Sequence, residues 1–132
     1  MSGPLHHIEL WTHDLSIAPS FDWLLGELGW ETRHDPEWPE GRTWHHPAGV
    51  YLVLEQSPAV IDTDHDRMRP GLNHLALTAP DRAALDRLRA DAAAHGWSEL
   101  FEDRYPHAGG PDHAALFVEN AQGFELEIIT TA

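Results

Sequence analysis

Two histidines occupy matching places in two similar segments of the chain. His7 lies in the segment Leu5-His6-His7-Ile8-Glu9-Leu10, and His74 lies 67 residues later in Leu72-Asn73-His74-Leu75-Ala76-Leu77. Both segments alternate like strands, and each carries its histidine opposite the apolar side chains. Imidazole is a common ligand of divalent metals. The pair therefore suggests metal chemistry.

The same offset of 67 residues relates other landmarks. Asp14 is matched by Asp81, and Gly29-Trp30 is matched by Gly96-Trp97. Three landmarks that share one offset indicate two copies of one supersecondary unit. A duplicated unit can bring one histidine from each first strand to a central pseudo-twofold axis.

Carboxylates share the histidines' strand parity. In the strands expected at 50–55 and 124–130, apolar residues take one face, and the side chains opposite them are Glu55, Glu125 and Glu127. Glu125 and Glu127 have the same parity, so either could be a ligand. Glu9 lies on the same face as His7. It could be an acid that supports a metal ligand without binding the metal, or a charge exposed to solvent. If helices cover the apolar faces, these groups project into the uncovered concave side.

The elements that must position these side chains follow one pattern twice. The first repeat, 5–56, predicts strands at 5–12, 30–34, 42–46 and 50–55 and a helix within 15–28 that begins near Ala18. The second repeat, 72–131, predicts strands at 72–78, 97–102, 112–119 and 124–130 and a helix that Asp81 caps and that runs to His95. A linker, 57–71, joins them. We expect inward-facing aromatic side chains to favour an apolar or aromatic ligand: Trp11, Trp44, Tyr51 and Phe117.

Composition narrows the function classes. The chain has 132 residues, which is one domain or two small halves that share a core. A formal charge of −14 argues against binding to nucleic acid or to an anionic membrane. The chain has no cysteine, which excludes disulfides and thiolate ligands. No signal peptide or membrane span is visible, so we expect a cytoplasmic protein.

The motifs resemble the vicinal oxygen chelate superfamily, which includes glyoxalase I, extradiol dioxygenases, fosfomycin-resistance enzymes and bleomycin-resistance proteins. The resemblance covers nearly the whole chain. It rests on the two histidine segments, on the helix and exit Phe21–Trp30, and on the terminal segment Glu119–Glu127. The terminal segment is similar to an Asp-Pro-x-Gly-x-x-x-Glu motif, which favours Glu127 over Glu125. Asn120-Ala121 stands in place of Asp-Pro.

The resemblance implies an α+β fold of two tandem βαβββ modules. These would form one glyoxalase-like domain, an open eight-stranded cup with the helices outside. It also implies a homodimer, with the cup completed within one chain or across two. A glyoxalase-type site implies four metal ligands: His7, Glu55, His74 and Glu127. A dioxygenase-type site implies three of them: His7, His74 and Glu127.

The implied chemistry depends on a divalent ion (Fe, Ni, Co, Mn or Zn) that chelates vicinal oxygens of a small organic substrate. In the isomerase or lyase reaction, Glu55 or Glu127 would move a proton. In the Fe(II) dioxygenase alternative, His113 or Tyr105 would be the acid–base partner, and His113 has inward parity. The absence of a cation after Glu127 argues against a phosphonate substrate.

A non-catalytic protein of the bleomycin-resistance type is the third alternative. Such proteins are acidic dimers that sequester a cationic drug and lack metal ligands. The charge of −14 fits this interpretation. The complete set of His7, His74 and Glu127 argues for the enzyme.

Overall fold

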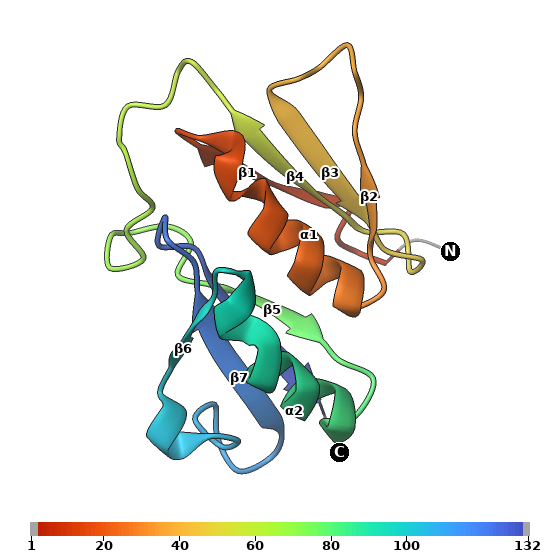
Figure 1. Cartoon of the computed structure of the whole chain (residues 1–132), viewed down its shortest axis with the longest axis vertical. Helices are drawn as coiled ribbons and strands as arrows, with labels where there is room; N and C mark the ends of the chain where they lie inside the picture. Colours follow the sequence, from red (N-terminus) through yellow and green to blue (C-terminus); the bar gives the residue numbers. More distant parts are fainter. Residues whose placement is uncertain (1–2, 131–132) are drawn as a thin grey trace. The chain divides into compact units, whose positions relative to one another are not determined.

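The computed structural model describes residues 3–130 and divides the chain into two compact units, Met1–Asp64 and His65–Ala132. We call them the N-terminal and C-terminal modules. Each has the element order βαβββ, and each forms one open four-stranded sheet, with its helix on one face (Figure 1). The predicted α+β fold of two tandem βαβββ modules is confirmed, with its eight strands in two sheets.

The N-terminal module has the sheet order β1-β4-β3-β2, in which β1 is parallel to β4 and the other pairs are antiparallel. Its elements are β1 (His7–Thr12), the 3-10 turn η1 (Leu15–Ile17), α1 (Ala18–Glu27), β2 (Glu31–Arg33), β3 (Gly41–His45) and β4 (Tyr51–Gln56). The predicted start of the helix near Ala18 is correct, because the turn η1 precedes it.

The C-terminal module repeats this topology in the order β5-β8-β7-β6, with β5 parallel to β8. Its elements are β5 (Leu75–Thr78), α2 (Arg82–Asp91), the 3-10 turn η2 (Ala92–His95), β6 (Ser98–Leu100), the 3-10 turn η3 (Glu102–Arg104), β7 (Ala114–Glu119) and β8 (Glu125–Thr130). His74 lies one residue before β5, not inside the strand as predicted.

The repeated landmarks perform the same local task in both modules. Asp14 accepts a hydrogen bond from the backbone of Ser16, and Asp81 accepts one from Ala84. Gly29 and Gly96 follow the helical segments with φ of 89° and 88°, a left-handed conformation that glycine adopts without a steric penalty. Local chemistry at both ends therefore sets the length of each helical segment.

Each module buries one face of its sheet beneath its helix. In the N-terminal module this core includes Phe21, Leu24, Leu25, Leu52 and Leu54. In the C-terminal module it includes Leu85, Leu88, Leu116, Leu126 and Ile128. Full burial of each such side chain contributes about 1.5–3 kcal/mol. The strand parity that these residues impose aims the alternate side chains at the opposite face of the sheet.

One predicted orientation is wrong. We expected Trp44 to line the cup, but it lies opposite Leu52 in the sheet register and is fully buried on the helix side. Its ring packs against Phe21, and its indole N–H donates to Asp22 Oδ1 at 2.8 Å. Burial of the largest side chain on β3 and satisfaction of its N–H decide this orientation.

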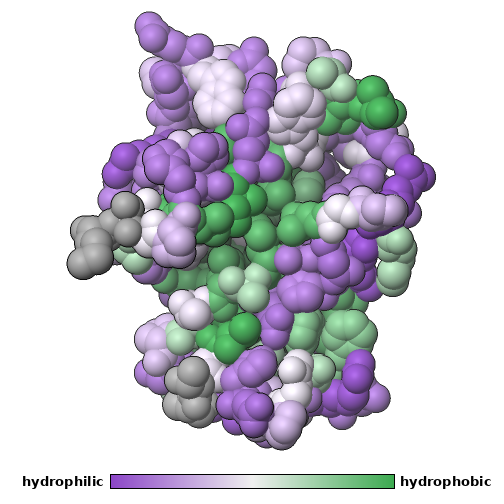
Figure 2. Space-filling model, turned by 180° about the vertical axis from the view of Figure 1, so that it is seen from behind, coloured by the Kyte–Doolittle hydropathy of each residue, from purple (hydrophilic) through white to green (hydrophobic). Residues whose placement is uncertain are grey.

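The hydropathy of the surface in view agrees with the acidic composition. Figure 2 shows hydrophilic side chains over much of one face of the molecule, with hydrophobic side chains between them, as expected for a chain with 22 acidic residues. Within residues 3–130, no helix is long and apolar enough to cross a membrane.

Candidate functional site

Glu127 lies on a central strand of the C-terminal sheet. It is opposite Ala76 of β5 and Phe117 of β7. Its neighbours Leu126 and Ile128 belong to the core beneath α2, so the carboxylate of Glu127 projects from the other face. Only 7 % of Glu127 is exposed. A carboxylate as buried as this one requires polar or cationic partners.

Two histidines contact the two oxygens of this carboxylate. His74 Nε2 is 3.0 Å from Glu127 Oε1, and His113 Nε2 is 3.5 Å from Glu127 Oε2. His113 Nε2 is buried and has no hydrogen-bond partner among the described residues. We call His74, His113 and Glu127 the imidazole–carboxylate cluster. Of the residues predicted from the sequence, these three are the ones that the C-terminal module brings together.

Gly109 closes one side of the cluster. A Cβ atom added to Gly109 would lie 3.0 Å from Glu127 Oε2, 3.1 Å from His113 Nε2 and 3.5 Å from Phe117 Cζ. The absence of a side chain at this position lets the backbone approach both polar groups closely.

The chemistry of this donor set fits a divalent metal as part of a coordination shell. Imidazole nitrogen and carboxylate oxygen together suit Fe, Mn, Co, Ni and Zn. The unpartnered nitrogen of His113 agrees with a further bound group. Within residues 3–130, however, no group of three His, Asp or Glu side chains is arranged to hold a metal by itself. The cluster would need further ligands from elsewhere.

An aromatic wall adjoins the cluster. Phe117 meets His74 edge to face at 5.8 Å between ring centroids, and Phe101 meets Phe117 at 5.4 Å. Phe101 has φ of 56° and is 41 % exposed. The guanidinium of Arg104 lies 5.0 Å from the centroid of the Phe101 ring. A non-glycine residue in this conformation is uncommon, and such residues gather at functional sites.

Glu125 lies deeper and is held by a cation. Its Oε1 is 3.0 Å from Arg67 Nε, and only 3 % of its side chain is exposed. Burial raises the pKa of Glu125, while the charges of Arg67 and His74 oppose this rise. Because Glu127 contacts both imidazoles and Glu125 is paired with Arg67, the geometry favours Glu127 as the ligand.

The N-terminal module surrounds its histidine differently. His7 lies opposite Tyr51, which lies opposite His45, and the three rings form a row across β1, β4 and β3. His7 stacks on Tyr51 at 4.8 Å between centroids, and Tyr51 stacks on His45 at the same distance. The nearest neighbour of His7 on β4 is therefore an aromatic ring and not a carboxylate.

Glu55 lies four residues beyond Tyr51 on β4, opposite Trp11. Because a strand rises about 3.3 Å per residue, the Cα atoms of Glu55 and Tyr51 are about 13 Å apart. Burial raises the pKa of Glu55, and the hydrogen bond that protonated Glu55 donates to Glu9, together with the charge of Glu9, raises it further. The structure groups Glu55 with Glu9 and Trp11, and it does not place Glu55 beside His7.

The sheet registers show which residues of the two modules are equivalent. Glu9 corresponds to Ala76 at the offset of 67, and their partners on the neighbouring parallel strands are Val53 and Glu127. Val53 thus occupies the place in the N-terminal sheet that Glu127 occupies in the C-terminal sheet. Glu55 corresponds to Ile129 by the same register.

Tyr105 lies away from the cluster. Its hydroxyl donates to Asp86 Oδ1 of α2 at 2.6 Å, and Arg89 lies 4.1 Å from its ring centroid. Burial and the bond to Asp86 raise the pKa of Tyr105 to about 12. Of the two acid–base partners predicted from the sequence, the structure brings His113 to Glu127, and it places the hydroxyl of Tyr105 against Asp86 of α2, the helix that covers the other face.

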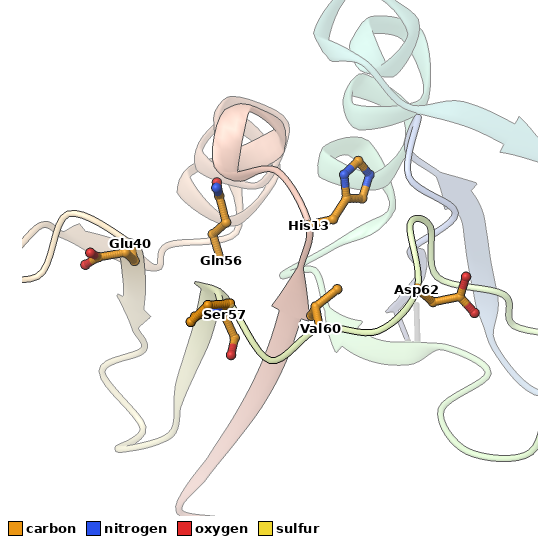
Figure 3. Close-up of a pocket in the computed structure, with 7 residues that line it drawn as sticks. His13, Glu40, Gln56, Ser57, Val60 and Asp62 are labelled. Atoms are coloured by element: carbon orange, nitrogen blue, oxygen red, sulfur yellow. The ribbon is translucent and has the colours of Figure 1, made fainter.

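A pocket of about 460 Å³ opens in the N-terminal module where β1 and β4 end (Figure 3). His13 Nε2 is 3.0 Å from Asp64 Oδ1 beside it, and Gln56 Oε1 accepts a hydrogen bond from the backbone of Leu15 at 2.7 Å. The residues that line it are His13, Glu40, Gln56, Ser57, Pro58, Val60 and Asp62. None of the site residues predicted from the sequence lines this pocket.

Sequence reasoning missed three contributors to the C-terminal site. Gly109 and Arg67 lie in connecting segments, where periodicity assigns no face, and Phe101 lies just after β6, although the strand predicted at 97–102 included it. The pair Gly109-Gly110 was a weak signal, because glycine permits the close approach of the backbone to another group. Nothing in the sequence singled out Phe101 or Arg67.

Comparison with known proteins gives one consistent family. The model of the glyoxalase/bleomycin resistance protein/dioxygenase superfamily matches residues 6–127. YqjT of Bacillus subtilis (strain 168), described as an uncharacterized protein, is 32 % identical over 126 residues, which are 95 % of this chain and 97 % of YqjT.

Solved structures agree. A crystal structure from Bacillus halodurans, named as a candidate glyoxalase, superposes with a TM-score of 0.86 at 40 % identity and covers 96 % of this chain and 95 % of its own. The fosfomycin resistance protein FosX from Listeria monocytogenes has a TM-score of 0.64 at 15 % identity, covering 97 % and 90 % of the two chains. The FosX crystal contains Mn(II) and 1S,2S-dihydroxypropylphosphonic acid; at this identity the likeness shows the fold alone.

Proposed function

Because the chain belongs to the glyoxalase/bleomycin resistance protein/dioxygenase superfamily, we propose that it is a metal-dependent enzyme acting on a small organic substrate with vicinal oxygen atoms. The observation that carries this proposal is the imidazole–carboxylate cluster, in which Glu127 is buried between His74 and an otherwise unpartnered His113 nitrogen. Both repeats would act as one domain.

The proposed ligands are His74 and Glu127 from the C-terminal module and His7 from the N-terminal module. The distance of Glu55 from the partner of His7 on β4 supports this three-ligand set, with Glu55 as a carboxylate outside it. The four-ligand set with Glu55 is the alternative. A divalent ion held there would act as a Lewis acid toward the substrate oxygens.

The chain's own groups have separate tasks. His113 Nε2 is in position to accept or return a proton beside Glu127, since no other described group occupies it. Phe117 and Phe101 form an apolar wall next to the polar groups, which suits an apolar or aromatic body on the substrate. Moving a proton between adjacent carbon atoms, as an isomerase or lyase does, needs one such base and a polarised oxygen.

A dioxygenase reaction is the second candidate. Two histidines and one carboxylate form the facial set that holds Fe(II) in oxygenases, and the separation of Glu55 favours a set of three. Substrate-dependent consumption of oxygen by the Fe(II)-loaded protein distinguishes this reaction from isomerisation.

Metal content of the untagged protein tests the proposal. We expect about one equivalent per chain by elemental mass spectrometry. The His74→Ala and Glu127→Ala variants should lose it, whereas the His34→Ala control, an exposed loop substitution, should retain it. If the wild type binds no Fe, Mn, Co, Ni or Zn after reconstitution, the enzyme proposal is wrong, and a ligand-sequestering role would fit the charge of −14 better.

A further inference from the structure

The residue before His74 holds its ring. His74 Nδ1 is 2.6 Å from Asn73 Oδ1, and Asn73 Nδ2 donates to the backbone carbonyl of Arg67 at 3.1 Å. A carbonyl oxygen only accepts hydrogen bonds, so the amide nitrogen of Asn73 faces Arg67 and the amide oxygen faces His74. The amide oxygen also only accepts, and the hydrogen of His74 therefore resides on Nδ1.

Arg67 is itself fixed by two carboxylates. Its guanidinium pairs with Glu119 of β7 and with Glu125 of β8, which lie opposite each other in the sheet. About 20 % of the Arg67 side chain is exposed. Ion pairs from the rigid fork of a guanidinium restrict its orientation. The carbonyl that receives the Asn73 amide thus belongs to a residue anchored on two strands.

A second attachment holds the same segment. The backbone N–H of His65 donates to the carbonyl of Gln122 at 2.9 Å, and its ring stacks on Phe124 at 5.2 Å between centroids. His65 Nε2 is 3.0 Å from the carbonyl of Leu72. The start of segment 65–73 is therefore tied to the β7–β8 turn, and the bond from His65 to Leu72 ties the end of the segment to its start, next to Asn73.

The tautomer of His74 has a chemical consequence. With the hydrogen on Nδ1, the lone pair of Nε2 faces Glu127 Oε1 at 3.0 Å. Two electron-rich atoms at this distance repel each other unless a proton or a cation lies between them. In the other tautomer, Nε2–H would donate to Glu127 directly, and the two groups would satisfy each other without a cation.

We propose that Asn73 is a positioning residue that fixes the Nδ1–H tautomer of His74, with the carbonyl of Arg67 orienting its amide, and thereby keeps Nε2 available to a cation shared with Glu127. The inference rests on the proposed function in treating Nε2 as a ligand atom. The tautomer itself does not depend on any bound metal.

Long-range ¹H–¹⁵N spectra of the histidine rings test the proposal in the full chain, treated with chelator. The His74→Gln variant identifies the His74 signals by their loss. In spectra recorded at a pH where the His74 ring is neutral, we expect the Nδ1–H tautomer in the wild type and a shift toward Nε2–H in Asn73→Ala, because donation to Glu127 then prevails. Asn73→Asp keeps an acceptor oxygen and should retain the wild-type tautomer. Met68→Ala, a substitution of a residue that is 78 % exposed in the same segment, is the matched control and should change nothing.

The affinity of the same proteins for Mn(II), measured by titration, gives an independent test. Loss of a residue that orients a metal-ligating histidine costs about 10–100-fold in affinity, so Asn73→Ala should bind that much more weakly than the wild type. An unchanged tautomer in Asn73→Ala overturns the inference, even if the wild type binds Mn(II). A shifted tautomer in a protein that binds no metal supports the role of Asn73 and rejects the proposed function instead.

Discussion

The two modules have the same topology, but they surround their equivalent histidines with different groups. In the C-terminal module, the amide of Asn73 holds His74, and the buried carboxylate of Glu127 faces it. In the N-terminal module, the equivalent of Asn73 is His6, whose Nδ1 lies 2.8 Å from Nδ1 of His7. An imidazole nitrogen can donate or accept, whereas the anchored amide of Asn73 only accepts toward His74.

The two modules also differ in where their carboxylates lie. Val53 stands where the C-terminal module has Glu127, and the acids of the N-terminal module, Glu9 and Glu55, contact each other. The two modules thus share one strand register, but the groups placed on it differ. The C-terminal module places an imidazole against a buried carboxylate, and the N-terminal module places His7 against an aromatic ring.

The largest expected effect is a difference between two carboxamide substitutions. Glu127→Gln should weaken Mn(II) binding by more than about 100-fold, beyond the usual effect of an outer partner, because it removes the anionic group between two imidazoles. Glu55→Gln should weaken it by less than about tenfold, because Glu55 is grouped with Glu9 and Trp11. Calorimetric titration measures both. Equal losses in the two variants would restore the four-ligand set.

The next effect concerns the two tyrosines, one in each module. Tyr51→Phe leaves Tyr105 as the sole phenol, and its absorbance should titrate near pH 12 instead of the ordinary pKa of 10, because of burial and the bond to Asp86. The pKa is raised in the folded state, so the hydroxyl's contribution to stability is complete below pH 10 and is lost as the pH rises through about 12.

Asp86→Asn in the Tyr51→Phe background removes the charge that opposes ionisation and should lower the midpoint of this titration. If Tyr105 in the Tyr51→Phe protein titrated near pH 10 while the protein was still folded by circular dichroism, the bond between Tyr105 and Asp86 of α2 would be contradicted, and the role of Tyr105 as an acid–base group would be open again.

A smaller effect is expected at Gly109. A Cβ there would lie 3.0 Å from Glu127 Oε2 and 3.1 Å from His113 Nε2, closer than ordinary van der Waals contact, so Gly109→Ala should displace the cluster by a few tenths of an ångström. Small misplacements of reacting groups are costly, and we expect about a tenfold weaker affinity for Mn(II). Gly26→Ala is the matched control, because a Cβ at Gly26 meets nothing within 4 Å. Equal affinities in both variants would show that the close approach of Gly109 to the cluster does not affect binding.

Strand parity predicted most of this arrangement. It placed His7, His74, His113 and Glu127 on the faces opposite the helices, because alternating leucine and isoleucine residues fixed those faces. It was wrong for Trp44, since Arg42-Thr43-Trp44-His45 has one large apolar side chain and no alternation that identifies its face. The face that Trp44 takes is decided only by its packing against Phe21 and its hydrogen bond to Asp22.

The sequence pattern could not predict the register between neighbouring strands or the contacts of side chains in connecting segments. Parity correctly gave the face of Glu55, but the partner of His7 on β4 depends on loop geometry, which turned out to select Tyr51. Tyr105 lies between η3 and β7, where no periodicity assigns a side, and its bond to Asp86 joins residues 19 positions apart. The role of Asn73 required knowing that the carbonyl of Arg67 faces its amide.

The smallest effect separates the two helix caps. Asp81 accepts a 2.8 Å hydrogen bond from the backbone of Ala84 in the first turn of α2, and Asp81→Ala should lower the free energy of unfolding by about 1 kcal/mol. Asp14 caps only the three-residue turn η1, and α1 begins separately after Ile17, so Asp14→Ala should have the smaller effect. Asp81→Asn retains the acceptor and serves as the control. Urea unfolding measures all three variants, and a larger loss for Asp14→Ala would show that η1 and α1 unfold as one capped helix, which would remove this difference between the modules.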